Sequence, residues 1–147
     1  MVREPHHDIG ELFMNKIIAL YDELLKKHGR PSGQWAMWCK RPKTIEEREE
    51  VLIGSILTQN TNWQNVSKAI ANLKKEKCLS LKKILSLEPE KLCELIRPAG
   101  FFNSKFKYLC GLAKFVADNG GVSKLMKREL PELRIELLKL KGVGPET

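Results

Sequence analysis

The chain has 147 residues, a length that suits one domain with a sizeable hydrophobic core. It carries 26 Lys and Arg residues against 18 Asp and Glu residues, and the formal charge of +8 is compatible with a polyanionic partner or with a solvated lysine-rich surface. The N-terminus lacks the apolar segment of a secretory signal and no apolar run is long enough to span a membrane, so we expect neither secretion nor a membrane partner.

The N-terminal part of the chain is predicted to form one long helix followed by a loop. Asp8 can cap a helix over 9–28, whose apolar residues share one face. The segment 30–43 is rich in Pro and Gly and is predicted as a loop that carries Trp35 and Trp38. We expect the apolar face of the helix to be exposed and to mediate self-association.

The remainder of the chain is predicted to be helical as well. Thr44 and Glu47 form a capping box, Asn62 can cap the next helix, and Asn103 is expected to cap a later one. The expected helices run over 44–57, 63–75, 80–87, 89–96, 103–118 and from Pro131 into the last residues. No alternation of period two is convincing, so the predicted fold class is all-α. Its parts are an N-terminal helix with a Trp-containing loop over 1–43, and a helical domain over 44–147.

The four cysteines show no metal-binding spacing. They are Cys39, Cys78, Cys93 and Cys110, and their intervals of 39, 15 and 17 residues contain no C-x-x-C pair. We therefore expect each to be a small buried or half-buried apolar residue of a reducing compartment.

The chain ends in a glycine turn, L-K-G-V-G-P-E-T at 140–147. Gly142 and Gly144 permit backbone torsions and close approaches that a side chain would block. Amide N–H groups exposed at a helix start would suit an anion such as a phosphate. The alternative is a helix C-cap followed by an ordinary turn. The pattern reads as a helix, a turn and the first residues of a second helix, so we expect the chain to be part of a larger protein.

Two loop tips lie at helix junctions. Gln59, in the loop 57–63, can exchange hydrogen bonds with a base edge or satisfy loop carbonyls instead. Phe101, in the loop 98–105, can wedge into a base stack, or the Phe101-Phe102 pair can pack into the core.

Together, these segments resemble the helix-hairpin-helix DNA glycosylase superfamily on its endonuclease III side. The order is L-I-G-S-I-L-T-Q-N-T at 52–61, G-F-F-N-S-K at 100–105 and L-K-G-V-G-P-E-T at 140–147. The L-T-Q-N-T form followed by an aromatic residue looks closest to the monofunctional 3-methyladenine glycosylase branch. The resemblance implies a base-excision repair enzyme that hydrolyses the N-glycosidic bond of damaged, alkylated bases. Its partner would be double-stranded DNA, and its location cytoplasmic and nucleoid-associated.

The resemblance also implies roles for particular residues. Gln59 matches the glutamine that fills the gap left by a flipped nucleotide, and Phe101 matches the wedge into the opposite strand. The hairpin that holds a phosphate matches Gly142, Val143 and Gly144. The base pocket matches Trp63, and more loosely Trp38 and Trp35. A monovalent cation would be held by the carbonyls of Leu138, Leu140 and Val143.

Departures from the family pattern concern catalysis. Glu146 stands where lyase-type members carry a lysine, and a carboxylate cannot form a Schiff base. The family's catalytic aspartate and its iron–sulfur cysteines would lie beyond Thr147. We therefore expect no catalytic residue and no cofactor within 1–147, and no activity from this chain alone. Two further interpretations are a non-catalytic helix-hairpin-helix DNA-binding module and an all-α interaction domain without a DNA role.

Overall fold

The computed structural model describes residues 6–147, and all side chains among them except those of 6–11 and 34. The chain divides into two compact units, Met1–Arg41 and Pro42–Thr147. The described residues contain helices and no strand, which confirms the all-α prediction. None of the helices found in this range combines the length and apolarity that a membrane crossing requires.

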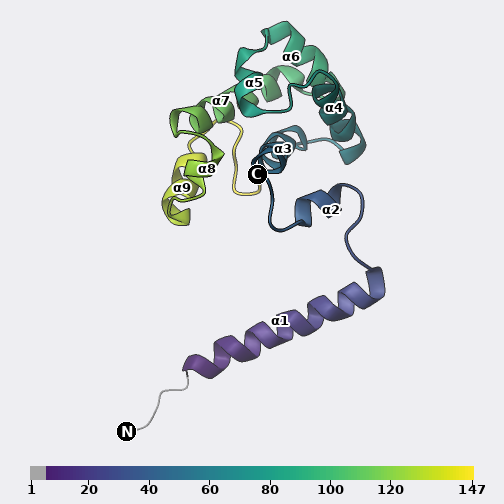
Figure 1. Ribbon diagram of the computed structural model, residues 1–147, viewed down its shortest axis with the longest axis vertical. Coiled ribbons are helices and arrows are strands. Elements are labelled where there is room, and N and C mark those ends of the chain that lie inside the picture. The colour runs from purple at the N-terminus through teal and green to yellow at the C-terminus, as the bar shows by residue number, and fades with distance from the viewer. Residues whose placement is uncertain (1–5) are drawn as a thin grey trace. The chain divides into compact units, whose positions relative to one another are not determined.

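The N-terminal unit consists of α1 (His6–His28) and α2 (Gln34–Cys39) (Figure 1). α1 ends where Gly29 adopts a φ of 74°, as predicted, but it begins at His6, so Asp8 lies within the helix and is not its cap. Apolar side chains of α1 are exposed, as expected, among them Phe13 (65%) and Tyr21 (56%). The self-association inferred from that face stays a prediction.

The prediction of a loop throughout 30–43 was wrong, because it contains α2. Gly33, with a φ of 57°, marks the start of this helix, and the six residues after it are free of proline and glycine. Cys39 at the end of α2 is exposed, which contradicts the expectation for that cysteine. Cys78 is buried and the other two cysteines are half-buried. Burial raises the pKa of the Cys78 and Cys110 thiols.

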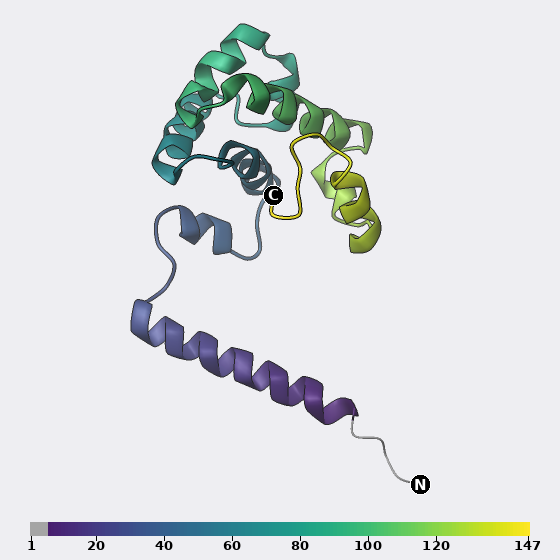
Figure 2. The same ribbon diagram turned by 180° about the vertical axis from the view of Figure 1, so that it is seen from behind.

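The C-terminal unit holds seven α-helices and one 3-10 helix, η1 (Figures 1 and 2). They are α3 (Ile45–Leu57), α4 (Trp63–Lys75), α5 (Leu81–Ser86), α6 (Pro89–Ile96), η1 (Arg97–Ala99), α7 (Phe102–Asp118), α8 (Val122–Leu125) and α9 (Leu130–Leu137). After α9 the chain turns back, and its last residues lie beside the end of α3.

Local capping determines where α3 and α4 start. The capping box of Thr44 and Glu47 is present in both directions, with Glu47 N donating to Thr44 Oγ1 at 3.2 Å and Thr44 N donating to Glu47 Oε2 at 2.9 Å. Asn62 Oδ1 accepts from Asn65 N at 3.0 Å at the start of α4. Both predicted caps are confirmed.

Two predicted helix boundaries of the C-terminal unit were wrong. Asn103 does not cap α7, because Phe101 precedes the helix in a left-handed conformation and its own carbonyl accepts from the amides of Ser104 and Lys105. The last helix does not run into the hairpin either. It ends at Leu137, and a tighter turn closes when Leu140 N donates to the Leu137 carbonyl at 3.0 Å.

The core of the C-terminal unit is built around α7, which packs against α3, α5 and α6. Buried apolar side chains come from α3 through α8 and their connections, and α9 adds half-buried Leu133 and Leu137. The largest fully buried side chains are Ile53, Ile56, Leu57, Leu73, Leu81, Ile84, Leu92, Ile96, Leu109 and Val66. This core supports the loops at the ends of α3 and η1.

Candidate functional site

One face of α7 contacts both of the other motif segments. Phe101 precedes the helix, Lys105 follows four residues later, and Tyr108 three residues after that. Lys105 and Tyr108 are three residues apart within the helix and lie on one side of it, and Phe101 directly precedes its first turn. The helix therefore presents one tip itself and can reach the Gln59 segment and the hairpin from the same side.

Lys105 joins the two loop segments. Its side chain is 2% exposed, and Nζ donates to the carbonyl of Leu57 at 2.8 Å and to that of Ala99 at 2.7 Å. Leu57 is the last residue of α3 and Ala99 the last residue of η1. Each lies two residues before a predicted tip, Gln59 or Phe101. Burial in the core lowers the pKa of the Lys105 ammonium group.

Tyr108 seats the hairpin on α7. Gly142 has a φ of +88°, and a Cβ placed on it would lie 2.2 Å from Cγ of the Tyr108 ring. No side chain fits such a distance, so the backbone of the hairpin packs directly on the ring. Glycine is required at position 142 for both torsion and space.

Gln59 also contacts the hairpin. Its Nε2 donates to the Gly142 carbonyl at 2.7 Å and to Thr147 Oγ1 at 3.2 Å. The side chain thus satisfies a backbone carbonyl, one that lies 83 residues further along the chain. The structure brings together the glutamine loop and the glycine turn that the sequence singled out separately.

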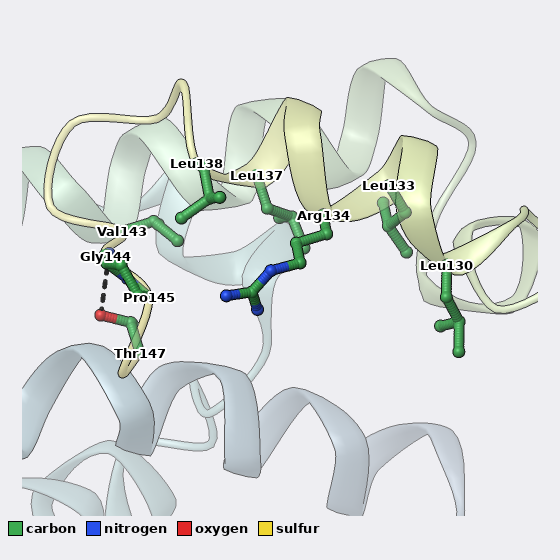
Figure 3. Close-up of a pocket in the computed structure, with 9 residues that line it drawn as sticks. All are labelled: Leu130, Leu133, Arg134, Leu137, Leu138, Val143, Gly144, Pro145 and Thr147. Carbon is green, nitrogen blue, oxygen red and sulfur yellow. Dashed lines mark hydrogen bonds between the residues drawn. The ribbon is translucent and has the colours of Figure 1, made fainter.

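The hairpin amides are engaged within the hairpin. Val143 N donates to the Leu140 carbonyl at 3.0 Å, and Gly144 N donates to Thr147 Oγ1 at 3.1 Å (Figure 3). The Thr147 hydroxyl oxygen occupies a position where an oxygen of a bound anion would accept from Gly144. One of the carbonyls predicted to hold a cation, that of Leu140, already accepts a hydrogen bond.

A groove of about 350 Å³ borders the hairpin on the α9 side. Figure 3 shows the α9 side chains along one edge and the hairpin residues along the other. Arg134 is the one charged residue among those that line it: Leu130, Leu133, Arg134, Leu137, Leu138, Val143, Gly144, Pro145 and Thr147.

Phe101 is the most exposed aromatic side chain of the described residues outside the N-terminal unit, at 70%. Its φ of 47° places a bulky residue in the left-handed region, where residues other than glycine are uncommon. The neighbouring Phe102 is half-buried, and the guanidinium carbon of Arg97 lies 4.7 Å from its ring centroid. The two phenylalanines therefore differ, with one packed on the domain and the other presented outward.

The predicted pocket residues fall into different units. Trp63 is the first residue of α4 and packs half-buried against the core. Trp35 and Trp38 belong to the N-terminal unit, where their rings meet edge to face with centroids 6.2 Å apart. Their shared role in a base pocket stays a prediction. Glu146 is exposed beside the hairpin.

Within residues 6–147 as described, no group of His, Cys, Asp and Glu side chains has the arrangement of a metal site. The expectation that the chain holds no cofactor is not tested by this finding. The backbone carbonyls proposed for a monovalent cation are of a different type and stay a prediction as well.

The structure is a helical domain in which a glutamine loop is hydrogen-bonded to a glycine turn 83 residues further along the chain. The family described as "HhH-GPD superfamily base excision DNA repair protein" matches residues 53–143, well over half of the chain. The matched segment includes Gln59, Phe101 and Gly142. The chain belongs to the HhH-GPD superfamily of base excision DNA repair proteins.

Similar proteins agree with this family and with the branch that the sequence resembles. A protein of Methanocaldococcus jannaschii named "Putative DNA repair glycosylase MJ1434" is 50% identical over 105 residues, which are 69% of this chain and 48% of that protein. "Endonuclease III homolog 1" of Saccharomyces cerevisiae is 30% identical over 67% of this chain and 25% of its own length. The crystal structure of H. pylori 3-methyladenine DNA glycosylase bound to 1,N6-ethenoadenine is similar with a TM-score of 0.65 and 32% identity. That match covers 91% of this chain and 59% of the H. pylori chain.

The chain spans about half the length of the M. jannaschii relative and a quarter of that of the yeast one. The family membership is therefore a property of the matched segment. What the whole protein does is a separate question, which the geometry of this segment addresses in part.

Sequence reasoning missed the roles of Lys105, Tyr108 and Thr147. For Lys105 a signal was available, because it lies four residues before Leu109 and seven before Leu112 on the buried face of α7. A lysine on an apolar face requires a polar partner. Tyr108 and Thr147 gave no such signal, since their contacts depend on how the hairpin folds back.

Proposed function

We propose that this chain is part of a DNA glycosylase that hydrolyses the N-glycosidic bond of damaged, alkylated bases in double-stranded DNA. The observation that carries the proposal is the direct linkage of the Gln59 loop, the Phe101 loop and the Gly142–Gly144 hairpin within a single domain. The family membership supports the repair role, and the similarity to the H. pylori enzyme supports the alkylated-base class.

The two loop tips, Gln59 and Phe101, match the first step of such a reaction. A base inside a duplex cannot be reached, so it must be extruded at a cost of a few kcal/mol. Insertion of Phe101 into the base stack and of Gln59 into the vacated space would offset part of that cost. The left-handed conformation of an exposed phenylalanine supports a binding role, because backbone strain of this type clusters at functional sites.

The hairpin would bind a phosphate through its amides. Gly144 N would exchange the Thr147 hydroxyl for a phosphate oxygen, and the +8 charge would add a salt-dependent attraction to the duplex. Such contacts position the protein without reading sequence. This suits an enzyme that must examine every base.

A positively charged alkylated purine would stack on Trp63, the aromatic residue at the end of the Gln59 loop. A cation–π contact of this kind contributes about 0.5–2 kcal/mol, with the larger value when water is excluded. The charge on the base also weakens its glycosidic bond, so the enzyme needs to supply less stabilisation to the leaving group.

Water, rather than an amine of the protein, would attack the sugar. Glu146 stands at the position of the lyase lysine and is exposed, so no Schiff base forms there and an intact abasic site is the product. None of the residues of 1–147 is assigned the catalytic acid. We therefore expect 1–147 to bind duplex DNA weakly, with steep salt dependence, and to release no base.

The test uses duplexes that carry 2-aminopurine beside an alkylated base, because its fluorescence rises when stacking is lost. The chain should raise the fluorescence, and Phe101→Ala should reduce the rise by about fivefold while salt-dependent binding persists. Leu85→Ala, which changes an exposed aliphatic residue on α5, is the control and should behave as the parent.

The alternatives give different results in this assay. A binding module without a repair role would bind the duplex with no fluorescence change and no effect of Phe101→Ala. An all-α interaction domain would not bind at all. A covalent adduct with damaged DNA after borohydride treatment would contradict the monofunctional mechanism, and base release by 1–147 would contradict the absence of a catalytic acid.

A further inference from the structure

We propose that Lys105 is a positioning residue that sets the Gln59 loop and the Phe101 loop in one register, so that the two tips enter a duplex as a unit. The proposal rests on the function proposed above. It adds a residue that neither touches DNA nor takes part in the chemistry.

The first support is that one ammonium group serves the ends of two segments. Leu57 closes α3 and Ala99 closes η1, and both carbonyls accept from Lys105 Nζ. The last carbonyls of a helix lack intrahelical partners, and the helix dipole is negative there. A cation is therefore the group best suited to bind these two carbonyls at once.

The second support is the desolvation cost of burying the charge of Lys105. It is the single charged or polar side chain among the buried residues of the part that the structure describes. Its neighbours on the same face of α7, Leu109 and Leu112, are apolar, and a leucine or methionine at 105 would avoid the desolvation of a charge. A buried charge at this position is explained by the bonds that it makes.

The third support is the path from these bonds to the tips. One residue separates Leu57 from Gln59, and one residue separates Ala99 from Phe101. Both loops are thus anchored next to their starting points by Nζ of Lys105. A displacement of one loop is therefore transmitted to the other. Free loops would have to be ordered separately when the tips insert, which costs conformational entropy.

The experiment compares Lys105→Met with Lys107→Met in the 2-aminopurine assay. Both variants remove one positive charge from α7, but Lys107 is exposed and serves as the matched control. Circular dichroism and thermal unfolding establish that each variant is folded. We expect Lys105→Met to bind undamaged duplex within about twofold of the control. Its fluorescence rise should fall by about tenfold or more, as an effect limited to insertion.

A double-mutant cycle separates positioning from general stability. Gln59→Ala, Phe101→Ala and the pair are measured in the parent chain and in the Lys105→Met background. In the parent chain, we expect the two substitutions to be non-additive by about threefold or more, because tips that insert together lose their effect together. In the Lys105→Met background the effects should be additive. Lys105→Arg, which keeps the charge and several donors, should restore part of the coupling.

The outcomes are distinguishable. A folded Lys105→Met variant that keeps the parent fluorescence rise and the parent coupling overturns the proposal for Lys105 and leaves the proposed function intact. A parent chain that gives no fluorescence rise overturns both. If Lys105→Met does not fold, Lys105→Gln retains one amide donor and replaces it in the same cycle, and undiminished coupling in that variant overturns the proposal.

Discussion

The two loop tips differ in how they are held in the free protein. Gln59 is half-buried, and its amide bonds to Gly142 and Thr147. Phe101 is 70% exposed and sits in a left-handed backbone conformation. In the free protein, the Gln59 side chain is therefore bound to the hairpin, whereas the Phe101 side chain is already exposed to solvent.

This difference determines whether the free-energy cost of presenting each tip arises on folding or on DNA binding. Breaking the contact of Gln59 costs about 0.5–1.5 kcal/mol per hydrogen bond at the moment of binding. The strain of Phe101 costs about 1–3 kcal/mol, but it is incurred on folding and does not reduce the affinity of a later step. If the two tips insert together as proposed, the release of Gln59 from the hairpin would limit their joint insertion, because Phe101 is already exposed.

The largest effect on stability should follow from a substitution that disrupts the packing of the hairpin to which Gln59 is bonded. Gly142→Ala places a methyl group 2.2 Å from the Tyr108 ring at a φ of +88°. We expect a loss of about 2–4 kcal/mol in the free energy of unfolding, from backbone strain and overpacking together. Urea unfolding measures this. Gly144→Ala is the control, because its Cβ would meet its nearest atom at 3.9 Å, and it should stay within about 0.5 kcal/mol of the parent.

An intermediate effect on stability should follow from replacing the amide donor of Gln59 with an acceptor. Gln59→Glu replaces the donor with a carboxylate that faces the Gly142 carbonyl, and we expect a loss of about 1–3 kcal/mol at neutral pH. At low pH the neutral acid can donate to that carbonyl. Its pKa would therefore lie above the unfolded value, so the stability of the variant should approach that of the parent in acid and decrease as the pH rises. A pH-independent loss would mean that the contact is not formed in solution.

The smallest effect should have the opposite sign. Phe101→Gly relieves the left-handed strain, and we expect a gain of about 0.5–1 kcal/mol in unfolding free energy together with loss of the 2-aminopurine signal. Phe102→Ala should have the opposite effect on stability. The Phe102 ring is half-buried and contacts Arg97, so its removal should lower the free energy of unfolding. A Phe101→Gly variant that is less stable than the parent would show that the ring packs on the domain instead of being presented.

The features that the sequence predicted are those whose cause lies within a few residues. The capping box at Thr44 and the Asn62 cap depend on side chains three residues away, and both were confirmed. The bond from Gln59 to Gly142 spans 83 residues and needed the folded chain. The left-handed Phe101 was missed because an asparagine two residues later gave a plausible cap that the chain does not use.

The hydroxyl of Thr147 competes with any external anion for the amide of Gly144. It accepts from Gly144 N at 3.1 Å and is tethered three residues away (Figure 3). A group on so short a tether is present at an effective concentration on the order of millimolar or more. A single phosphate ion would have to displace it unaided, whereas a duplex supplies further charges that favour the exchange. If the hairpin binds DNA as proposed, this hydroxyl makes it respond to the polymer and stay closed toward the free phosphate of the surrounding solution.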